Sequence, residues 1–286
     1  SQRLKELRGE GLRREIIVAF GPGLPMNTET AELKQRIFEL SVTAWQEHTQ
    51  NMESLPTAWI QSVKNRGSKL CVADAQAGGM SLNGYRTLTA AISFSRLIRR
   101  YSPNKGKAAE KNIGLLLPTS SAGLIANMAA LMAAKTLVNL NYTASLSALE
   151  SAVQKAEIKT LLTSRKFLKK LQQRGIDFSD LLQPLQVIYL EDLATEISSW
   201  RKVVTLLAVR LLPASVLHRL FVSNTDEKQP AAILFSSGSE GEPKGVMLSQ
   251  QNIMANIKQV SDVLDTRSDD KIMATLPLFH AFGLTV

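Results

Sequence analysis

Serine, glycine and lysine residues that suit phosphate binding are gathered in one stretch, Ser236–Gly245, which reads SSGSEGEPKG. Its three glycines let the backbone turn N–H groups inward, and its hydroxyls and the Lys244 ammonium add further donors. An apolar run at 231–235 precedes the stretch and predicts a buried strand that leads into it. The pattern therefore predicts a cradle for a polyphosphate, although an ordinary solvent loop of turn residues is the alternative.

Two common nucleotide motifs do not fit this stretch. A Walker A loop needs Gly-Lys-Ser/Thr at the start of a helix, whereas here Pro243 precedes Lys244 and Gly245 follows it. The dinucleotide fingerprint G-x-G-x-x-G is absent as well. The phosphate chemistry must therefore belong to another class of loop.

The run FSSGSEGEPKGV at 235–246 resembles the signature phosphate loop of the adenylate-forming enzymes, such as acyl-CoA synthetases, luciferases and peptide-synthetase adenylation domains. Glu240 stands where Thr is commoner, which removes one hydroxyl donor. The Ser-Glu-Gly variant is typical of one branch, the bifunctional 2-acylglycerophosphoethanolamine acyltransferase/acyl-[acyl-carrier-protein] synthetases. Four further stretches are similar to that branch: 141–144, 156–160, 187–193 and 276–286.

The resemblance implies that a fatty acid carboxylate attacks ATP to give an acyl-adenylate, with Mg²⁺ as the metal and pyrophosphate as the leaving group. It assigns the β- and γ-phosphates of ATP to Ser236, Ser237, Gly238, Ser239, Glu240, Gly241 and Lys244. Lys244 and His280 are the expected catalytic residues, because the position matching His280 lies beside the acyl carboxylate in the family. A histidine that merely satisfies the start of a helix is the alternative for His280. No metal ligand is assigned within the chain, since the family's Mg²⁺-binding Glu is expected after Val286.

Strands that alternate with helices predict an α/β fold built of largely parallel βαβ sheets. Strands are expected at 15–20, 113–117, 136–140, 158–163, 187–190, 231–235 and 272–276. Helices are expected from about residue 30 and at 85–98, 124–134, 145–156, 165–174 and 249–264. With the resemblance, these elements correspond to the N-terminal subdomains of the adenylate-forming fold, preceded by the tail of an acyltransferase domain.

The expected domain organisation has three segments. Residues 1–55 are expected to be the C-terminal tail of a lysophospholipid acyltransferase domain, 56–80 a linker, and 81–286 the N-terminal part of an AMP-binding domain truncated at Val286. Acyltransferases of this branch use a His-x-x-x-x-Asp pair, in which the acid orients a histidine base. His48 is followed at that spacing by Glu53, which we interpret as chance, so that active site is expected outside the chain.

The chain of 286 residues is basic, with 34 Lys+Arg against 25 Asp+Glu and a net charge of +9. Basic clusters at 96–111 and 155–174 suit an acidic acyl carrier protein or an anionic membrane. Aromatic residues make up only 6% and do not interleave with these charges, which argues against nucleic acid. One cysteine excludes an internal disulfide framework and a Cys-based zinc site.

Two apolar segments raise the question of a membrane. The uncharged stretch 112–134 is interrupted by Pro118 and Gly123, so a strand, a loop and a helix are expected instead of a span. The segment 200–221 is apolar and basic, and it is either a helix packed at a domain edge or an amphipathic segment on a membrane surface.

The leading hypothesis is ATP-dependent activation of a fatty acid and its transfer to acyl carrier protein or CoA. The full protein would also reacylate lysophosphatidylethanolamine, at the cytoplasmic face of a bacterial inner membrane, and the chain alone is expected to be inactive. The alternatives are another acyl-CoA, aryl or amino acid adenylating enzyme, and a non-enzymatic basic binding module.

Overall fold

The computed structural model describes residues 17–49, 52–75, 79–104, 106, 109–224, 229–236, 243–264, 266–267 and 269–285. The chain divides into two units, Ser1–Met52 and Glu53–Val286. In the first unit, helix α2 spans Thr30–Thr49. The strand expected at 15–20 is wrong over 17–20, which have no regular structure and are exposed. A short apolar run forms a strand only where another strand accepts and donates its backbone hydrogen bonds.

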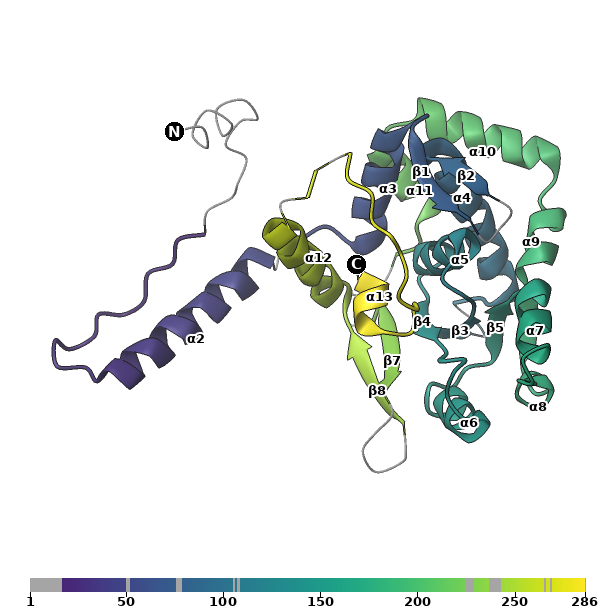
Figure 1. Ribbon diagram of the computed structural model, residues 1–286. Helices are drawn as coiled ribbons and strands as arrows, with labels where there is room; N and C mark the ends of the chain where they lie inside the picture. Colours follow the sequence, from purple (N-terminus) through teal and green to yellow (C-terminus); the bar gives the residue numbers. More distant parts are fainter. Residues whose placement is uncertain are drawn as a thin grey trace. The chain divides into compact units, whose positions relative to one another are not determined.

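The second unit contains the elements that the sequence pattern predicts there, except the strand at 272–276, and several more (Figure 1). Its helices are α3 (Leu55–Arg66), α4 (Gly84–Tyr101), α5 (Ser121–Met132), α6 (Leu146–Lys155), α7 (Arg165–Gln172), α8 (Ser179–Leu182), α9 (Leu190–Glu196), α10 (Ser199–Leu211), α11 (Ala214–Phe221), α12 (Gln250–Leu264) and α13 (Ala281–Thr285). Its strands are β1 (Leu70–Asp74), β2 (Met80–Asn83), β3 (Asn112–Leu116), β4 (Thr136–Asn139), β5 (Thr160–Thr163), β6 (Gln186–Tyr189), β7 (Ala232–Ser236) and β8 (Lys244–Leu248).

The central sheet has six strands in the order β6-β5-β3-β4-β7-β8. Every neighbouring pair is parallel except β7 and β8, which form an antiparallel hairpin. Strands β1 and β2 form a separate two-stranded antiparallel sheet. The predicted α/β fold with a largely parallel sheet is thereby confirmed. Strand β8, which forms the hairpin with β7, was not predicted.

The two faces of the central sheet bury different sets of side chains. Ile113 and Leu115 of β3 pack with α5 on one face, whereas Leu116 of β3 and Val138 of β4 pack with α6 on the other. This alternation follows from the two-residue period of a strand. Consequently α5, which leaves β3, and α6, which leaves β4, cover opposite faces of the sheet (Figure 1).

Two segments differ from the sequence prediction. The stretch 56–80, expected to be a linker, contains most of α3 and all of β1, and Pro56 occupies the first turn of α3, where its missing N–H costs nothing. The strand expected at 272–276 is wrong, because these residues have no regular structure and Met273 is 83% exposed. Their apolar pattern fits a buried strand, but the described part of the sheet ends at β8 and pairs no strand with them.

Within the described ranges, none of the helices combines the length and the apolar composition needed to cross a bilayer. The uncharged stretch 112–134 is divided between β3 and α5, joined by a short connection, as the sequence predicts.

A buried charged pair lies where strands β3, β4 and β5 begin. Glu110 is 6% exposed, and its carboxylate accepts hydrogen bonds from the backbone N–H groups of Lys159 and Thr160, both at 2.8 Å, and from the Ser102 hydroxyl at 2.7 Å. Lys135 is 1% exposed and donates from Nζ to the Glu110 carbonyl oxygen. Burial lowers the pKa of Lys135 to about 8, an effect that the negative charge of Glu110 opposes.

The low pKa of Lys135 predicts a pH-dependent stability. Between pH 8 and 10.5 the unfolded chain binds a proton at this amine that the folded chain has lost, so the free energy of unfolding should rise with pH. We expect a rise on the order of 2 kcal/mol relative to Lys135→Met, measured by urea unfolding across this pH range. The prediction would be contradicted if the free energies of unfolding of the unaltered protein and of Lys135→Met changed with pH in parallel.

Candidate functional site

The carboxyl ends of β3 and β4 are the position at which ligands typically bind in open α/β sheets. The chain leaves β3 toward α5 on one face and leaves β4 toward α6 on the opposite face. Such a reversal of direction opens a crevice at the carboxyl ends of the two strands. Thr119 follows β3 and Tyr142 follows β4, so both residues lie at this edge.

The segment 276–280 lies against this edge of the sheet. The Thr119 hydroxyl donates a hydrogen bond to the Leu276 carbonyl oxygen at 2.9 Å, and the ring of Tyr142 meets that of Phe279 edge-on, with centroids 5.0 Å apart. Tyr142 also makes an edge contact with Phe167 at 5.0 Å. Burial raises the pKa of Tyr142. These contacts fix the segment to residues that follow both β3 and β4.

His280 stands at the end of this segment, immediately before α13. Its side chain is exposed, and its ring centroid lies 4.8 Å from that of buried Phe279. Its backbone N–H donates to the Pro277 carbonyl at 3.1 Å, and its carbonyl accepts from the Leu284 N–H at 2.9 Å. The backbone of His280 thus begins α13 while its imidazole remains accessible at the edge where a ligand is expected.

The turn that contains His280 requires a glycine at position 283. A Cβ there would clash with the Pro277 carbonyl oxygen, from which it would lie only 2.2 Å away. We expect Gly283→Ala to shift the turn and to lower the predicted adenylate-forming activity by about tenfold or more, since a small displacement of His280, the predicted catalytic residue, would be costly. Rates of acyl-adenylate formation by the whole protein would measure this effect. Gly23→Ala is the control, because Gly23 is exposed, has no left-handed φ, and a Cβ there would meet nothing within 4 Å. An unchanged rate in Gly283→Ala would contradict the prediction.

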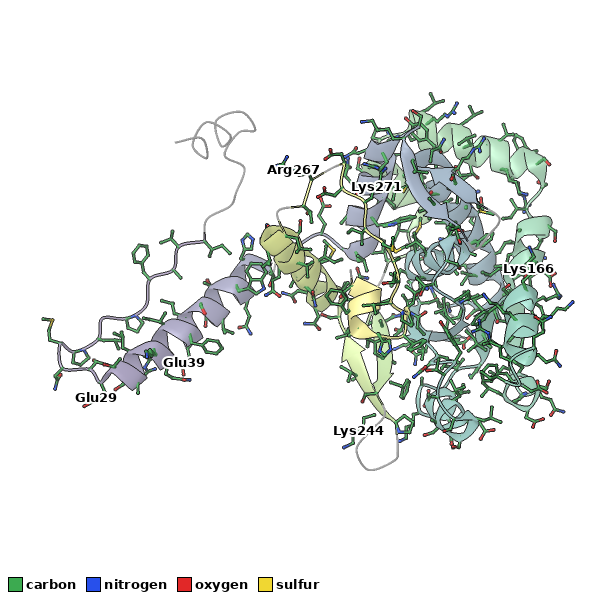
Figure 2. All side chains as sticks on the ribbon, in the orientation of Figure 1. Glu29, Glu39, Lys166, Lys244, Arg267 and Lys271 are labelled. Atoms are coloured by element: carbon green, nitrogen blue, oxygen red, sulfur yellow. The ribbon has the colours of Figure 1, made fainter. Side chains whose placement is uncertain are left out.

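Of the residues predicted to bind phosphate, the structure describes Ser236 and Lys244. They lie opposite one another as a register pair, Ser236 at the end of β7 and Lys244 at the start of β8. Ser237, Gly238, Ser239, Glu240 and Gly241 lie outside the described residues. Figure 2 shows Lys244 at the end of the hairpin, where its side chain is exposed. Because β7 runs parallel to β4, Ser236 at the end of β7 lies at the same edge of the sheet as Tyr142.

The hairpin that carries these two residues is closely packed. A Cβ on Gly245 would lie 3.2 Å from ring atom Cε1 of Phe235, so a glycine lets the ring rest on the opposite strand. Pro243 is buried, and its carbonyl oxygen accepts a hydrogen bond from Lys155 Nζ at 3.2 Å. Pro243 and Gly245 therefore both have packing roles, and Lys244 between them is exposed.

The N-terminus of α5 is a second place where an anion could bind, but the protein's own groups occupy it. The Asp74 carboxylate accepts from the N–H of Ser121 at 2.8 Å and from its hydroxyl at 3.1 Å. The Ser120 hydroxyl accepts from the Gly123 N–H at 3.1 Å. With these N–H groups engaged, the stretch after β7 is the better candidate for phosphate.

The structure thus pairs Ser236 with Lys244 and places His280 in a separate segment, at the carboxyl edge of β3 and β4. That His280 and Lys244 act on one substrate stays a prediction. Sequence reasoning missed Thr119 and Tyr142 as residues that position the His280 segment. The signal was present, since both follow directly after predicted strands, where the carboxyl edge of a parallel sheet must lie.

The model of the AMP-binding enzyme family matches residues 68–286. The chain belongs to this family. AMP-binding enzymes of known structure have the same fold: O-succinylbenzoate coenzyme A synthetase of Bacillus subtilis, solved in complex with AMP, aligns with a TM-score of 0.58 at 19% identity. That alignment covers 79% of this chain and 51% of the synthetase.

Curated AMP-binding relatives are similar in sequence. The 4-coumarate–CoA ligase-like protein 9 of Arabidopsis thaliana is 30% identical over 179 residues, which is 61% of this chain and 29% of the relative. A chloroplastic long-chain-fatty-acid–[acyl-carrier-protein] ligase of the same plant is 40% identical over 57 residues, 20% of this chain and 8% of the relative. The chain spans less than a third of the length of these curated relatives.

ATP and Mg²⁺ are the groups that membership of the AMP-binding family implies. Ser236 and exposed Lys244 offer a hydroxyl and an ammonium, which suit the phosphates of ATP. Among the described residues, no group of three His, Cys, Asp or Glu side chains is placed to hold a metal ion. Binding of the nucleotide phosphates by Ser236 and Lys244, and of Mg²⁺ with them, stays a prediction.

Proposed function

We propose that the chain is the ATP-binding part of an enzyme that activates a fatty acid as acyl-adenylate and transfers the acyl group to acyl carrier protein. In the same proposal, the whole protein reacylates lysophosphatidylethanolamine at the cytoplasmic face of a bacterial inner membrane. The observation that carries the proposal is that Ser236 and Lys244, at the two ends of the Ser/Gly/Lys stretch, form a register pair at the carboxyl end of β7. Strand β7 runs parallel to β4 in a chain that belongs to the AMP-binding family.

The chemistry follows from this placement. A fatty acid carboxylate oxygen bonds to the α-phosphorus of ATP while the bond from that phosphorus to pyrophosphate breaks, and the electron pair leaves on pyrophosphate. Ser236 and Lys244 are suited to stabilise the negative charge that grows on the leaving group, because preoriented donors favour the transition state. Mg²⁺, when bound, would supply further charge neutralisation on the phosphates. His280 is proposed to lie beside the acyl carboxylate.

Two observations support acyl carrier protein as the acceptor. One of the relatives is named as a ligase of long-chain fatty acids with acyl carrier protein. The chain also carries a net charge of +9, which suits an acidic partner protein. Another relative is named as a CoA ligase-like protein, so CoA as the acceptor, and an aryl or amino acid as the activated acid, remain the competing proposals.

The test is an exchange assay with the whole protein. Exchange of labelled pyrophosphate into ATP should depend on a medium- or long-chain fatty acid, and the acyl group should then appear on acyl carrier protein. Exchange with aryl or amino acids alone, or transfer to CoA alone, would favour the competing ligases. Binding of acyl carrier protein without any exchange would favour a non-enzymatic module. The chain of residues 1–286 assayed alongside should give no exchange.

A further inference from the structure

Helix α10 is apolar on two opposite sides. Its inner side buries Thr205 and Val209, which are 2% and 0% exposed, and α10 packs against α4. Its outer side carries five exposed apolar residues: Trp200 (70%), Val203 (55%), Val204 (39%), Leu207 (49%) and Leu211 (77%). Their spacing of three, one, three and four residues places them in one continuous row along the helix. We call this row the outer stripe.

The charged residues of α10, which flank the outer stripe, are all basic. Between residues 197 and 225 the sequence contains no Asp or Glu, but it contains four Lys or Arg residues: Arg201, Lys202, Arg210 and Arg219. At 100° per residue, Arg201 falls on one flank of the stripe and Arg210 on the other. The preceding acid, Glu196, is engaged by Arg100 at 2.9 Å and by the Tyr101 hydroxyl at 2.6 Å. The outer stripe is therefore a row of apolar residues with a cation on each flank.

A cavity of about 370 Å³ lies beside the stripe, between α4, α9 and α10. Phe94, Ile197 and Leu206 line it, and Val203 belongs both to its wall and to the outer stripe. Lys202 lies at the cavity, and its ammonium donates to the Ala194 carbonyl at 3.1 Å. The apolar surface of α10 is therefore continuous with an apolar recess that has a cation beside it.

We propose that the outer stripe of α10 binds the surface of a bilayer that contains anionic phospholipid. Its apolar residues enter the boundary between headgroups and acyl chains, where Trp200 suits the interface, and Arg201 and Arg210 lie over lipid phosphates. A bilayer fits better than a second copy of the chain. A symmetric pair of stripes would place the basic flanks of both copies together, and no described acidic side chain of α10 or α11 would compensate them. The proposal names a surface for the membrane location proposed above and rests on that part of the proposed function.

The test is flotation of the purified chain with vesicles, without ATP. Vesicles of phosphatidylcholine with about a quarter phosphatidylglycerol should carry the chain upward at low salt, and pure phosphatidylcholine vesicles should carry much less. The pair Arg201→Gln and Arg210→Gln should lower the partition coefficient for the anionic vesicles by about 30-fold, since each cation contributes about fivefold. The pair Trp200→Ser and Leu207→Ser should lower it by at least about tenfold.

The matched control is the pair Val263→Ser and Leu264→Ser on α12, which removes apolar residues that are 83% and 63% exposed away from α10. It should float like the unaltered chain, and circular dichroism checks that all variants are folded. The proposal fails if the unaltered chain does not float with anionic vesicles, or if the α10 variants float equally well. It also fails if the chain is a dimer by gel filtration that the α10 variants dissociate. A negative exchange assay leaves this result unaffected, so the two proposals fail separately.

Discussion

Replacement of Lys244 by Ala should lower the rate of fatty-acid-dependent exchange of pyrophosphate into ATP by about 10²–10³-fold in the whole protein. Lys244 is exposed at the start of β8 and lies opposite Ser236, at the edge of the sheet where the phosphates are proposed to bind. Its loss removes a cation that acts mainly on charge developing in the transition state, and kcat should therefore fall more than KM rises.

Lys166→Ala is the matched control, because Lys166 is an exposed lysine on α7, away from the hairpin (Figure 2). Its exchange rate should equal that of the unaltered protein. Lys244→Arg should retain part of the rate, because it keeps the positive charge but changes its shape. Exchange that is the same in Lys244→Ala as in the unaltered protein would remove Lys244 from the mechanism and weaken the proposed function.

The second large effect is expected on stability. Glu110→Ala should lower the free energy of unfolding by about 3–5 kcal/mol, measured by urea unfolding at pH 7. The substitution leaves the N–H groups of Lys159 and Thr160 and the Ser102 hydroxyl without their buried acceptor. It also removes the anion whose charge favours the buried ammonium of Lys135. A loss of this size is a large part of the 5–15 kcal/mol that typically stabilises a domain.

Glu150→Ala provides the control, since Glu150 is an exposed residue on α6 and its replacement should change stability by less than about 0.5 kcal/mol. Glu110→Gln should fall between the two, because the amide keeps an acceptor oxygen but loses the charge and places an N–H₂ group opposite a donor. Equal stability of the Glu110→Ala and Glu150→Ala variants would show that the buried carboxylate contributes nothing.

Most of the alternating elements from α4 to β7 were predictable, because β3, β4 and β5 are buried along most of their length and α4 and α6 each carry a clear apolar side. Thus β3 reads as a largely apolar run in the sequence, as parallel strands covered by helices do. The segments 15–20 and 272–276 have the same apolar composition but form no strand in their described parts. A strand also needs a neighbour for its backbone hydrogen bonds, and composition does not reveal whether one exists.

The candidate site was predictable in its chemistry but not in its arrangement. The types and order of Ser236, Lys244 and Gly245 predict phosphate binding, because hydroxyl, cation and backbone donors are local properties. The close approach of Phe235 to Gly245 and the bond from Thr119 to the Leu276 carbonyl are not local. The latter joins residues 157 positions apart, which only the folded sheet brings together.

The buried amine of Lys135 has a consequence for chemical reactivity. With a pKa of about 8, about half of these amines are neutral, and thus nucleophilic, at pH 8. The side chain is only 1% exposed, so an acylating reagent in solution cannot reach it while the edge of the sheet is closed. The rate at which Lys135 is modified therefore depends on how often the protein opens at this edge. Measuring that rate would give the free energy of local opening at the start of β4.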